Sequence, residues 1–164
     1  MNLFLQFFIL IPLTGFVISL LIPEKNEDLL STVSFGMVGL NLSAILIFLV
    51  YWLFSGFPIL NHESITLYQT GDYDFFIDFY FDKITAVYLL VGALLTFLVT
   101  IYSRYYLHRE TGYKRFFNTI LFFYLGYNVA VLSGNLETLF IGGRTAHFFS
   151  NHIQPLLFTP RNWL

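Results

Sequence analysis

The sequence predicts an all-α integral membrane protein with four transmembrane helices, a truncated fifth helix, and an external β-hairpin between the second and third helices. The composition is the first reason: 57% of the 164 residues are apolar and 11% are charged, whereas soluble domains carry about 25% charged residues. The second reason is that the apolar residues gather in runs of about 20, the length of helix that crosses a bilayer. The third is an alternation of aromatic and acidic residues between two of these runs, which has the period of a β-strand.

The composition also excludes several kinds of site. A net charge of −2, with no stripe of basic residues, argues against nucleic-acid binding. The absence of cysteine excludes thiolate metal sites, disulfides and iron–sulfur ligation. The histidines lie far apart in the sequence and are interpreted as incidental rather than as metal ligands: His62, His108, His147 and His152. We therefore expect no catalytic, cofactor-binding or metal-binding residue in this chain, and no cofactor.

The first division, residues 1–54, contains two apolar runs joined by a short polar turn. The run Leu3–Ile22 gives about 30 Å of helix, enough to span a membrane. No basic residue precedes it and no cleavage motif follows it, so we expect a retained helix rather than a signal peptide. Because the turn at Pro23–Asp28 is short, the second run, Leu29–Phe54, is expected to return antiparallel beside the first.

Two residues inside these runs carry specific expectations. Pro12 lacks a backbone N–H and frees a carbonyl group, which we expect a neighbouring helix to satisfy. Asn41 is an amide and not an acid, so it is expected to hydrogen-bond between helices rather than to carry protons.

The second division, residues 55–82, contains acidic residues but no lysine or arginine. From Asp74 onward the side chains alternate between two faces, which predicts a strand; one face carries Phe75, Ile77, Phe79 and Phe81. Ile65 and Leu67 indicate a weaker strand upstream, with a turn at residues 70–72. An exposed aromatic strand is prone to aggregation. We therefore expect this hairpin to lie on the outer membrane surface and to pack against its own helices or a partner subunit.

The third division, residues 83–142, opens with the apolar run Lys83–Tyr102. Asp82 is expected to cap this helix, because a carboxylate is favourable at a helix N-terminus. The loop that follows, Ser103–Arg115, holds four of the eight basic residues of the chain: Arg104, Arg109, Lys114 and Arg115. By the positive-inside rule this loop is cytoplasmic, so the hairpin and the N-terminus lie outside. We interpret these charges as a topology signal rather than a binding site.

The fourth apolar run, Phe116–Ser133, places Asn128 between Gly126 and Ala130, two small residues suited to close helix packing. A fifth apolar segment begins at Leu136 and is expected to end after Gly142. The last division, residues 143–164, gathers two prolines, two arginines and two histidines. Because proline and charged residues interrupt a spanning helix, we expect a disordered or interfacial tail there.

Three motifs resemble a known family. They are FIDFYFDKIT, which ends at Thr85, then IYSRYYLHRETGYKRFF at Ile101–Phe117, and SGNLETLFIG at Ser133–Gly142. Together with the order of helices and hairpin, they are similar to the N-terminal part of chain 5 of NADH–quinone oxidoreductase, or complex I. The same family includes the large subunits of multisubunit sodium/proton antiporters and of bicarbonate-uptake complexes.

The resemblance implies a proton-translocating subunit of a respiratory complex in the inner (plasma) membrane, with lipid and other membrane subunits as partners. Family members move protons through buried glutamate and lysine residues, and they continue beyond the third motif with Trp-Glu. Gly143 and Arg144 occupy those positions here, so we expect that the gene is frameshifted or prematurely ended. We also expect that the chain alone does not conduct protons. Glu137 is a candidate for proton access from an outer half-channel, although an interfacial position is the other interpretation.

Two alternatives stay open at this point. The first is a membrane subunit of a cation/proton antiporter or of a bicarbonate-uptake complex, which shares the same motifs without redox chemistry. The second is a non-catalytic four-helix membrane scaffold. By family the chain is part of a translocase, but it contains no catalytic or redox residue of its own.

Overall fold

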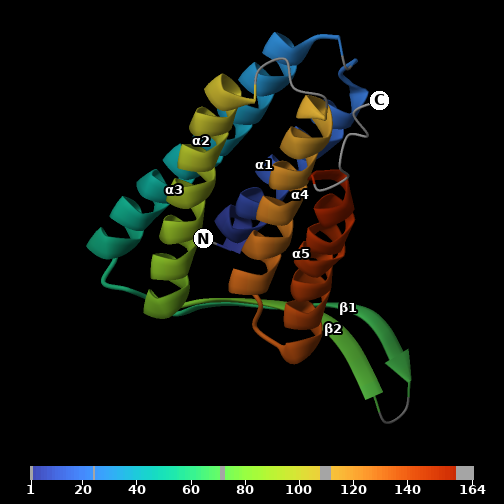
Figure 1. The fold of residues 1–164 in the computed structure, drawn as a ribbon. Coiled ribbons are helices and arrows are strands. Elements are labelled where there is room, and N and C mark those ends of the chain that lie inside the picture. Colours follow the sequence, from blue (N-terminus) through green and yellow to red (C-terminus); the bar gives the residue numbers. More distant parts are fainter. Residues whose placement is uncertain (1, 24, 71–72, 108–111, 158–164) are drawn as a thin grey trace.

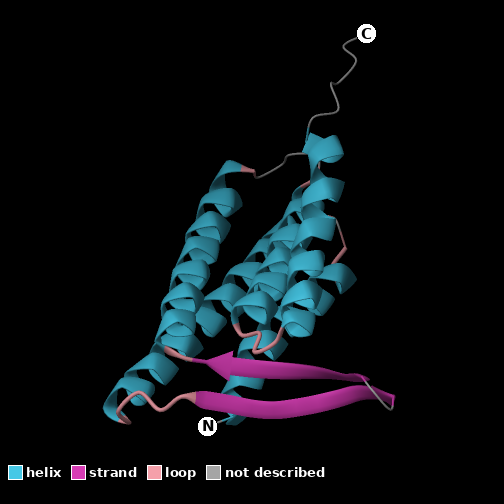
Figure 2. Ribbon diagram, turned by 90° about the horizontal axis from the view of Figure 1, so that it is seen from below, coloured by secondary structure: helices cyan, strands magenta, loops and turns pink. Residues whose placement is uncertain are grey.

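Five helices and one β-hairpin make up the part of the chain that the structure describes, which is residues 2–23, 25–70, 73–107 and 112–157 of a computed structural model. In order, the elements are α1 (Asn2–Leu21), α2 (Glu27–Phe54), β1 (Leu60–Thr70), β2 (Tyr73–Phe81), α3 (Lys83–Tyr106), α4 (Tyr113–Val131) and α5 (Leu136–Leu157). The helices run side by side, and the hairpin crosses one end of the bundle (Figures 1 and 2). We call this the hairpin end, and the opposite end the basic end.

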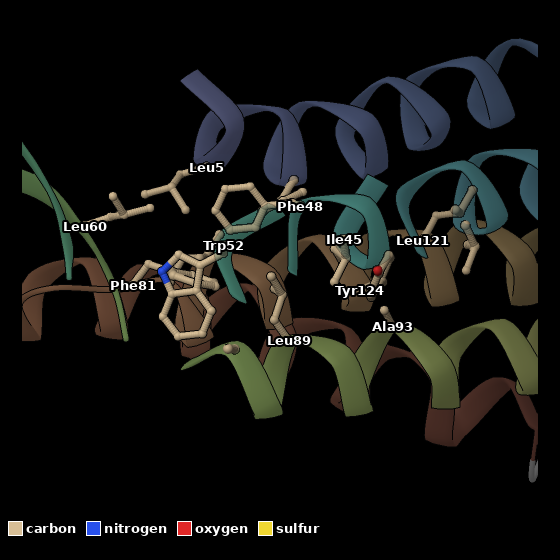
Figure 3. Close-up of a cluster of buried hydrophobic side chains, with 14 residues drawn as sticks. Leu5, Ile45, Phe48, Trp52, Leu60, Phe81, Leu89, Ala93, Leu121 and Tyr124 are labelled. Carbon is tan, nitrogen blue, oxygen red and sulfur yellow. The ribbon is translucent and has the colours of Figure 1, made fainter. Parts of the chain in front are cut away.

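An aromatic cluster holds the hairpin against the bundle. Phe81, the last residue of β2, is fully buried, and its ring centroid lies 5.2 Å from that of Phe48 and 5.2 Å from that of Trp52, both edge-to-face. Phe8 of α1 packs on Phe48 at 5.3 Å. Edge-to-face contacts are favourable beyond the apolar area that they bury. Figure 3 shows this part of the core, to which α1, α2, α3, α4 and the hairpin all contribute.

Backbone hydrogen bonds join the hairpin to the turn between α4 and α5. Tyr80 N donates to Leu132 O at 2.9 Å, and Gly134 N donates to Asp78 O at 2.8 Å. A Cβ atom on Gly134 would lie 2.8 Å from Asp78 Oδ2 and 3.3 Å from Asp78 O, so the turn approaches β2 closely at this glycine. The predicted strand from Asp74 is confirmed as part of β2. Of the two packing alternatives, the structure shows the first, because Phe81 of β2 packs on α2.

The upstream strand is longer than predicted. β1 pairs antiparallel with β2 along its length, with register shifts between His62 and Ile65 and between Thr66 and Tyr68. Such bulges disturb the strict alternation of side chains, which explains why the sequence pattern was weak here. The predicted turn at residues 70–72 falls largely outside the described residues.

Two helices of the described chain are long and apolar enough to cross a membrane, α2 and α3. The apolar part of α1, Leu5–Leu21, is shorter than that criterion requires. The structure thus gives a mostly helical bundle with two candidate spans, and the count of four spans stays a prediction.

The predicted end of the fifth helix at Gly142 was wrong. α5 continues for 22 residues to Leu157. Gly142 does not end the helix but lets it approach α4, because a Cβ atom there would lie 2.6 Å from Ala130 N. The apolar composition ends at this point, whereas the backbone hydrogen bonds of the helix continue through residues that are mostly exposed, such as Gly143 and Arg144. Of the tail predicted to be disordered or interfacial, residues 143–157 belong to α5, and residues 158–164 lie outside the described residues.

Candidate functional site

Three fully buried polar side chains meet inside the bundle, and we call them the polar node: Asn41 of α2, and Tyr124 and Asn128 of α4. Asn41 Nδ2 donates to the Tyr124 hydroxyl at 2.9 Å. Tyr124 and Asn128 are one helical turn apart, and their side chains are within hydrogen-bonding reach of each other. The surroundings are apolar: Figure 3 shows Tyr124 beside Ile45, Ala93 and Leu121.

The node also completes the hydrogen bonding of α1. Pro12 lies inside α1 and has no N–H to donate to the carbonyl four residues earlier, which is that of Phe8. Asn128 Nδ2 donates to Phe8 O at 3.0 Å. A neighbouring helix therefore satisfies the carbonyl freed by proline, as the sequence predicted.

The node has hydrogen-bonding capacity to spare but no charge. Asn41 Oδ1 and Asn128 Oδ1 are buried and have no hydrogen-bond partner in the described structure. Two amides and a phenol can hold a neutral polar molecule, but none of them is a proton donor or acceptor of the kind that acid–base chemistry near neutral pH requires.

The basic end of the bundle carries three of the residues that the sequence assigned to topology. Arg104 Nη2 donates to Thr32 Oγ1 at 3.2 Å, at the start of α2. Lys114 Nζ donates to Leu20 O at 3.1 Å, where a cation also complements the C-terminal end of α1. Arg115 is exposed, and Arg109 lies outside the described residues.

Comparison with known proteins points to one family. Residues 67–117 match the family described as NADH-ubiquinone oxidoreductase (complex I), chain 5 N-terminus. NADH-quinone oxidoreductase subunit L of Neisseria meningitidis serogroup A is 33% identical over 137 residues, covering 81% of this chain and 20% of that protein. The subunit L of Pseudomonas aeruginosa is 33% identical over 138 residues, covering 81% and 22%. That of Escherichia coli is 28% identical over 135 residues, covering 82% and 22%.

The chain is related to the N-terminal portion of subunit L. It spans about a fifth of the length of the curated relatives that it matches. The match to the chain 5 family runs from β1 to the first turn of α4, so it contains Asp82 and the basic loop but none of the polar node.

Within the region shared with the chain 5 family, Asp82 is the residue whose role the structure defines best. Its Oδ1 accepts a hydrogen bond from Thr85 N at 2.8 Å, so Asp82 is the N-cap of α3. This is the structural role that the sequence predicted for it. The cap fixes the point at which β2 ends and α3 begins.

Beyond the region that matches the chain 5 family, Glu137 lies in the first turn of α5, partly exposed. Asn135 caps the same helix by accepting from Thr138 N at 2.8 Å. A carboxylate is favourable at this position whether or not it handles protons. No group of three or more histidine or acidic side chains comes together within the described residues.

Sequence reasoning predicted the role of one member of the polar node, Asn41, and not those of the other two. Asn41 was recognised because an amide in an apolar run needs a partner, and the same argument could have been applied to Asn128, which was noted only for its place between two small residues. Tyr124 was one aromatic residue among many. The signal that could have found it is its place on the buried stripe of α4, which carries Phe117, Leu121, Tyr124 and Asn128.

Proposed function

We propose that this chain forms the first helices and the outer hairpin of a proton-translocating membrane subunit of the NADH–quinone oxidoreductase type, in a bacterial inner membrane. The observation that carries this proposal is the match of residues 67–117 to the chain 5 family, supported by subunit L relatives at 33% identity over most of this chain. Other membrane subunits of the complex, and lipid at the apolar helix faces, are the partners that this function requires.

Within such a subunit we assign this region a structural role, not the proton path. A path for protons across hydrocarbon needs ionisable groups at membrane depth. The buried polar residues among those described are all uncharged: Ser19, Ser31, Ser34, Asn41, Thr85, Thr100, Ser103, Asn128 and Thr138. The bundle therefore supports and positions the hairpin and the neighbouring helices, and the rest of the subunit supplies the conducting residues.

A chimera tests the proposal. Residues 1–142 of this chain would replace the matching region of the Pseudomonas aeruginosa subunit L, and proton pumping driven by NADH would be measured in membrane vesicles. We expect assembly and pumping to be retained. A chimera that assembles but no longer pumps would contradict the structural role.

Glu137 needs its own measurement, because it is the proposed candidate for proton access from the outer side. In the same chimera, Glu137→Gln keeps the shape of the side chain and removes its charge. A structural role at the start of α5 predicts unchanged pumping with a small loss of stability. A drop in pumping without loss of assembly would instead assign Glu137 to an outer half-channel.

A further inference from the structure

The hydrogen bonds of the polar node do not close among the protein groups alone. Asn41 uses its Nδ2 on Tyr124 and Asn128 uses its Nδ2 on Phe8 O, at 2.9 and 3.0 Å. Both residues are 0% exposed, and the Oδ1 atom of each is without a donor. A buried acceptor without a donor costs about as much as a lost hydrogen bond, so each such atom in a packed core needs an explanation.

Turning the amides over does not remove the deficit. If Asn128 were rotated by half a turn, its oxygen would face the carbonyl oxygen of Phe8, and two acceptors would meet. If Asn41 were rotated, its oxygen could accept from Tyr124, but its NH₂ group would then lack a partner. Two polar groups of the node therefore stay without a partner in either orientation of Asn41.

Tyr124 adds a third unmet requirement, of the opposite kind. Its hydroxyl oxygen accepts from Asn41, and its own proton needs an acceptor. Asn128 approaches the same hydroxyl, but its Oδ1 has no hydrogen-bond partner and so does not accept this proton. Two buried amide oxygens and the Tyr124 proton are therefore the groups of the node that most need a further partner.

We propose that the polar node binds one water molecule, which accepts from the Tyr124 hydroxyl and donates to Asn41 Oδ1 and Asn128 Oδ1. Three hydrogen bonds are the usual number for a buried water, and one water would supply a donor for each amide oxygen and an acceptor for the Tyr124 proton. Both amides lie against the same phenol, which brings the three groups into one neighbourhood. The water links α2 to α4, and through Asn128 and Phe8 it is connected to α1.

Water fits this site better than a cation does. A sodium ion would also take the two amide oxygens, but every member of the node is uncharged, and an unpaired cation inside a bundle surrounded by lipid is costly. The site is independent of the proposed function, because it depends only on the packing of α1, α2 and α4.

Solid-state NMR of the full chain in lipid bilayers tests the proposal directly. Magnetisation transfer from water would be measured to the side-chain amides of Asn41 and Asn128. The backbone amide of Ile45, which is also fully buried and lies one turn from Asn41 on α2, is the dry reference. We expect transfer to both side chains to be several-fold faster than to Ile45, and Tyr124→Phe to reduce it. Equal transfer at all three positions in the wild-type chain would overturn the proposal.

A second measurement separates water from a cation without any substitution. A high-resolution map of the wild-type chain should show density within hydrogen-bonding distance of the three oxygen atoms of the node. That density should be the same in sodium-free buffer and should give no anomalous signal when rubidium replaces sodium. Anomalous scattering at the site, or a well-resolved node with no density, would overturn the assignment to water.

Discussion

At the scale of single residues, the backbone N–H that Pro12 lacks accounts for a hydrogen bond between α1 and α4, two helices that are far apart in the sequence. Pro12 leaves Phe8 O without its usual donor, and Asn128 supplies one from α4. The same asparagine belongs to the polar node, so the α1–α4 contact and the node depend on each other. An apolar residue at position 128 would leave the Phe8 carbonyl buried without a partner.

This dependence predicts coupling between positions 12 and 128. Asn128→Leu should destabilise the chain, and Pro12→Ala should reduce that loss because the substitution restores a backbone N–H that can donate to Phe8 O. We expect a coupling free energy of about 0.6 kcal/mol, the average for hydrogen bonds between membrane helices, and no more than about 1.7 kcal/mol, the largest such value. The measurement is a double-mutant cycle by reversible unfolding in detergent or bicelles.

Asn118→Leu, on the same helix, is the control and should not couple to Pro12→Ala. If Asn128→Leu lowered the free energy of unfolding equally with proline and with alanine at position 12, the proposed compensation would be refuted.

Tyr113 gives a prediction about pH at the basic end of the bundle. Burial raises the pKa of its phenol, and the negative charge of Glu27 adds to this effect, while the hydrogen bond with Ser31 lowers it. The folded state therefore holds this proton more tightly than the unfolded state, whose pKa is about 10. Its contribution to stability is fully present below that pH and is lost as the pH rises through the folded-state pKa. Above about pH 10, the free energy of unfolding of the Tyr113→Phe variant should therefore fall less steeply with pH than that of the wild-type chain. The measurement is equilibrium unfolding of both proteins at a series of pH values, and parallel plots of unfolding free energy against pH would contradict the prediction.

At the scale of helices and strands, close approach of backbones decides which positions must be glycine. Gly142 of α5 faces the backbone of Ala130, with a prospective Cβ only 2.6 Å from Ala130 N and 2.8 Å from its Cα. Gly143, the next residue, has nothing within 4 Å of the same prospective atom. The two neighbours therefore form a matched pair with opposite expectations.

Gly142→Ala should destabilise the chain by about 1 to 3 kcal/mol, because the added methyl group overpacks a contact with backbone that cannot rotate away. Gly143→Ala should be neutral or stabilising by up to about 1 kcal/mol, since alanine favours the helix more than glycine does. Equilibrium unfolding of both variants under one condition measures the difference. If the two substitutions had the same effect, the α4–α5 contact at Gly142 would not be as close as the structure gives it.

How well each element could be predicted from the sequence depends on the range of the interaction that defines it. The Asp82 cap and strand β2 follow from residues close together in the sequence, and both were found. The extent of α5 depends on backbone hydrogen bonds that continue after the apolar composition ends, so the predicted end at Gly142 was wrong. Tyr124 needed knowledge of which face of α4 is buried, and for that reason the node was only partly visible.

At the scale of the whole molecule, the two ends of the bundle differ in chemistry. Arg104 and Lys114 bind the ends of α2 and α1 at the basic end. The opposite end carries the hairpin, the Asp82 cap and the first turn of α5. An excess of lysine and arginine on one side of a membrane protein marks the cytoplasmic side. We therefore propose that the basic end is cytoplasmic and that the hairpin end lies outside the membrane.

Labelling of single cysteines tests this orientation on a chain that contains no native cysteine. Asn26 and Ser55 are exposed residues that flank α2, the first at the basic end and the second at the hairpin end. Ser55→Cys in spheroplasts should react with a maleimide that cannot cross the membrane, whereas Asn26→Cys should react only after permeabilisation. Each variant is the control for the other, because the two sites flank the same helix and carry the same new thiol. The reverse pattern would invert the topology, and reaction of both sites in intact spheroplasts would mean that α2 does not cross the membrane.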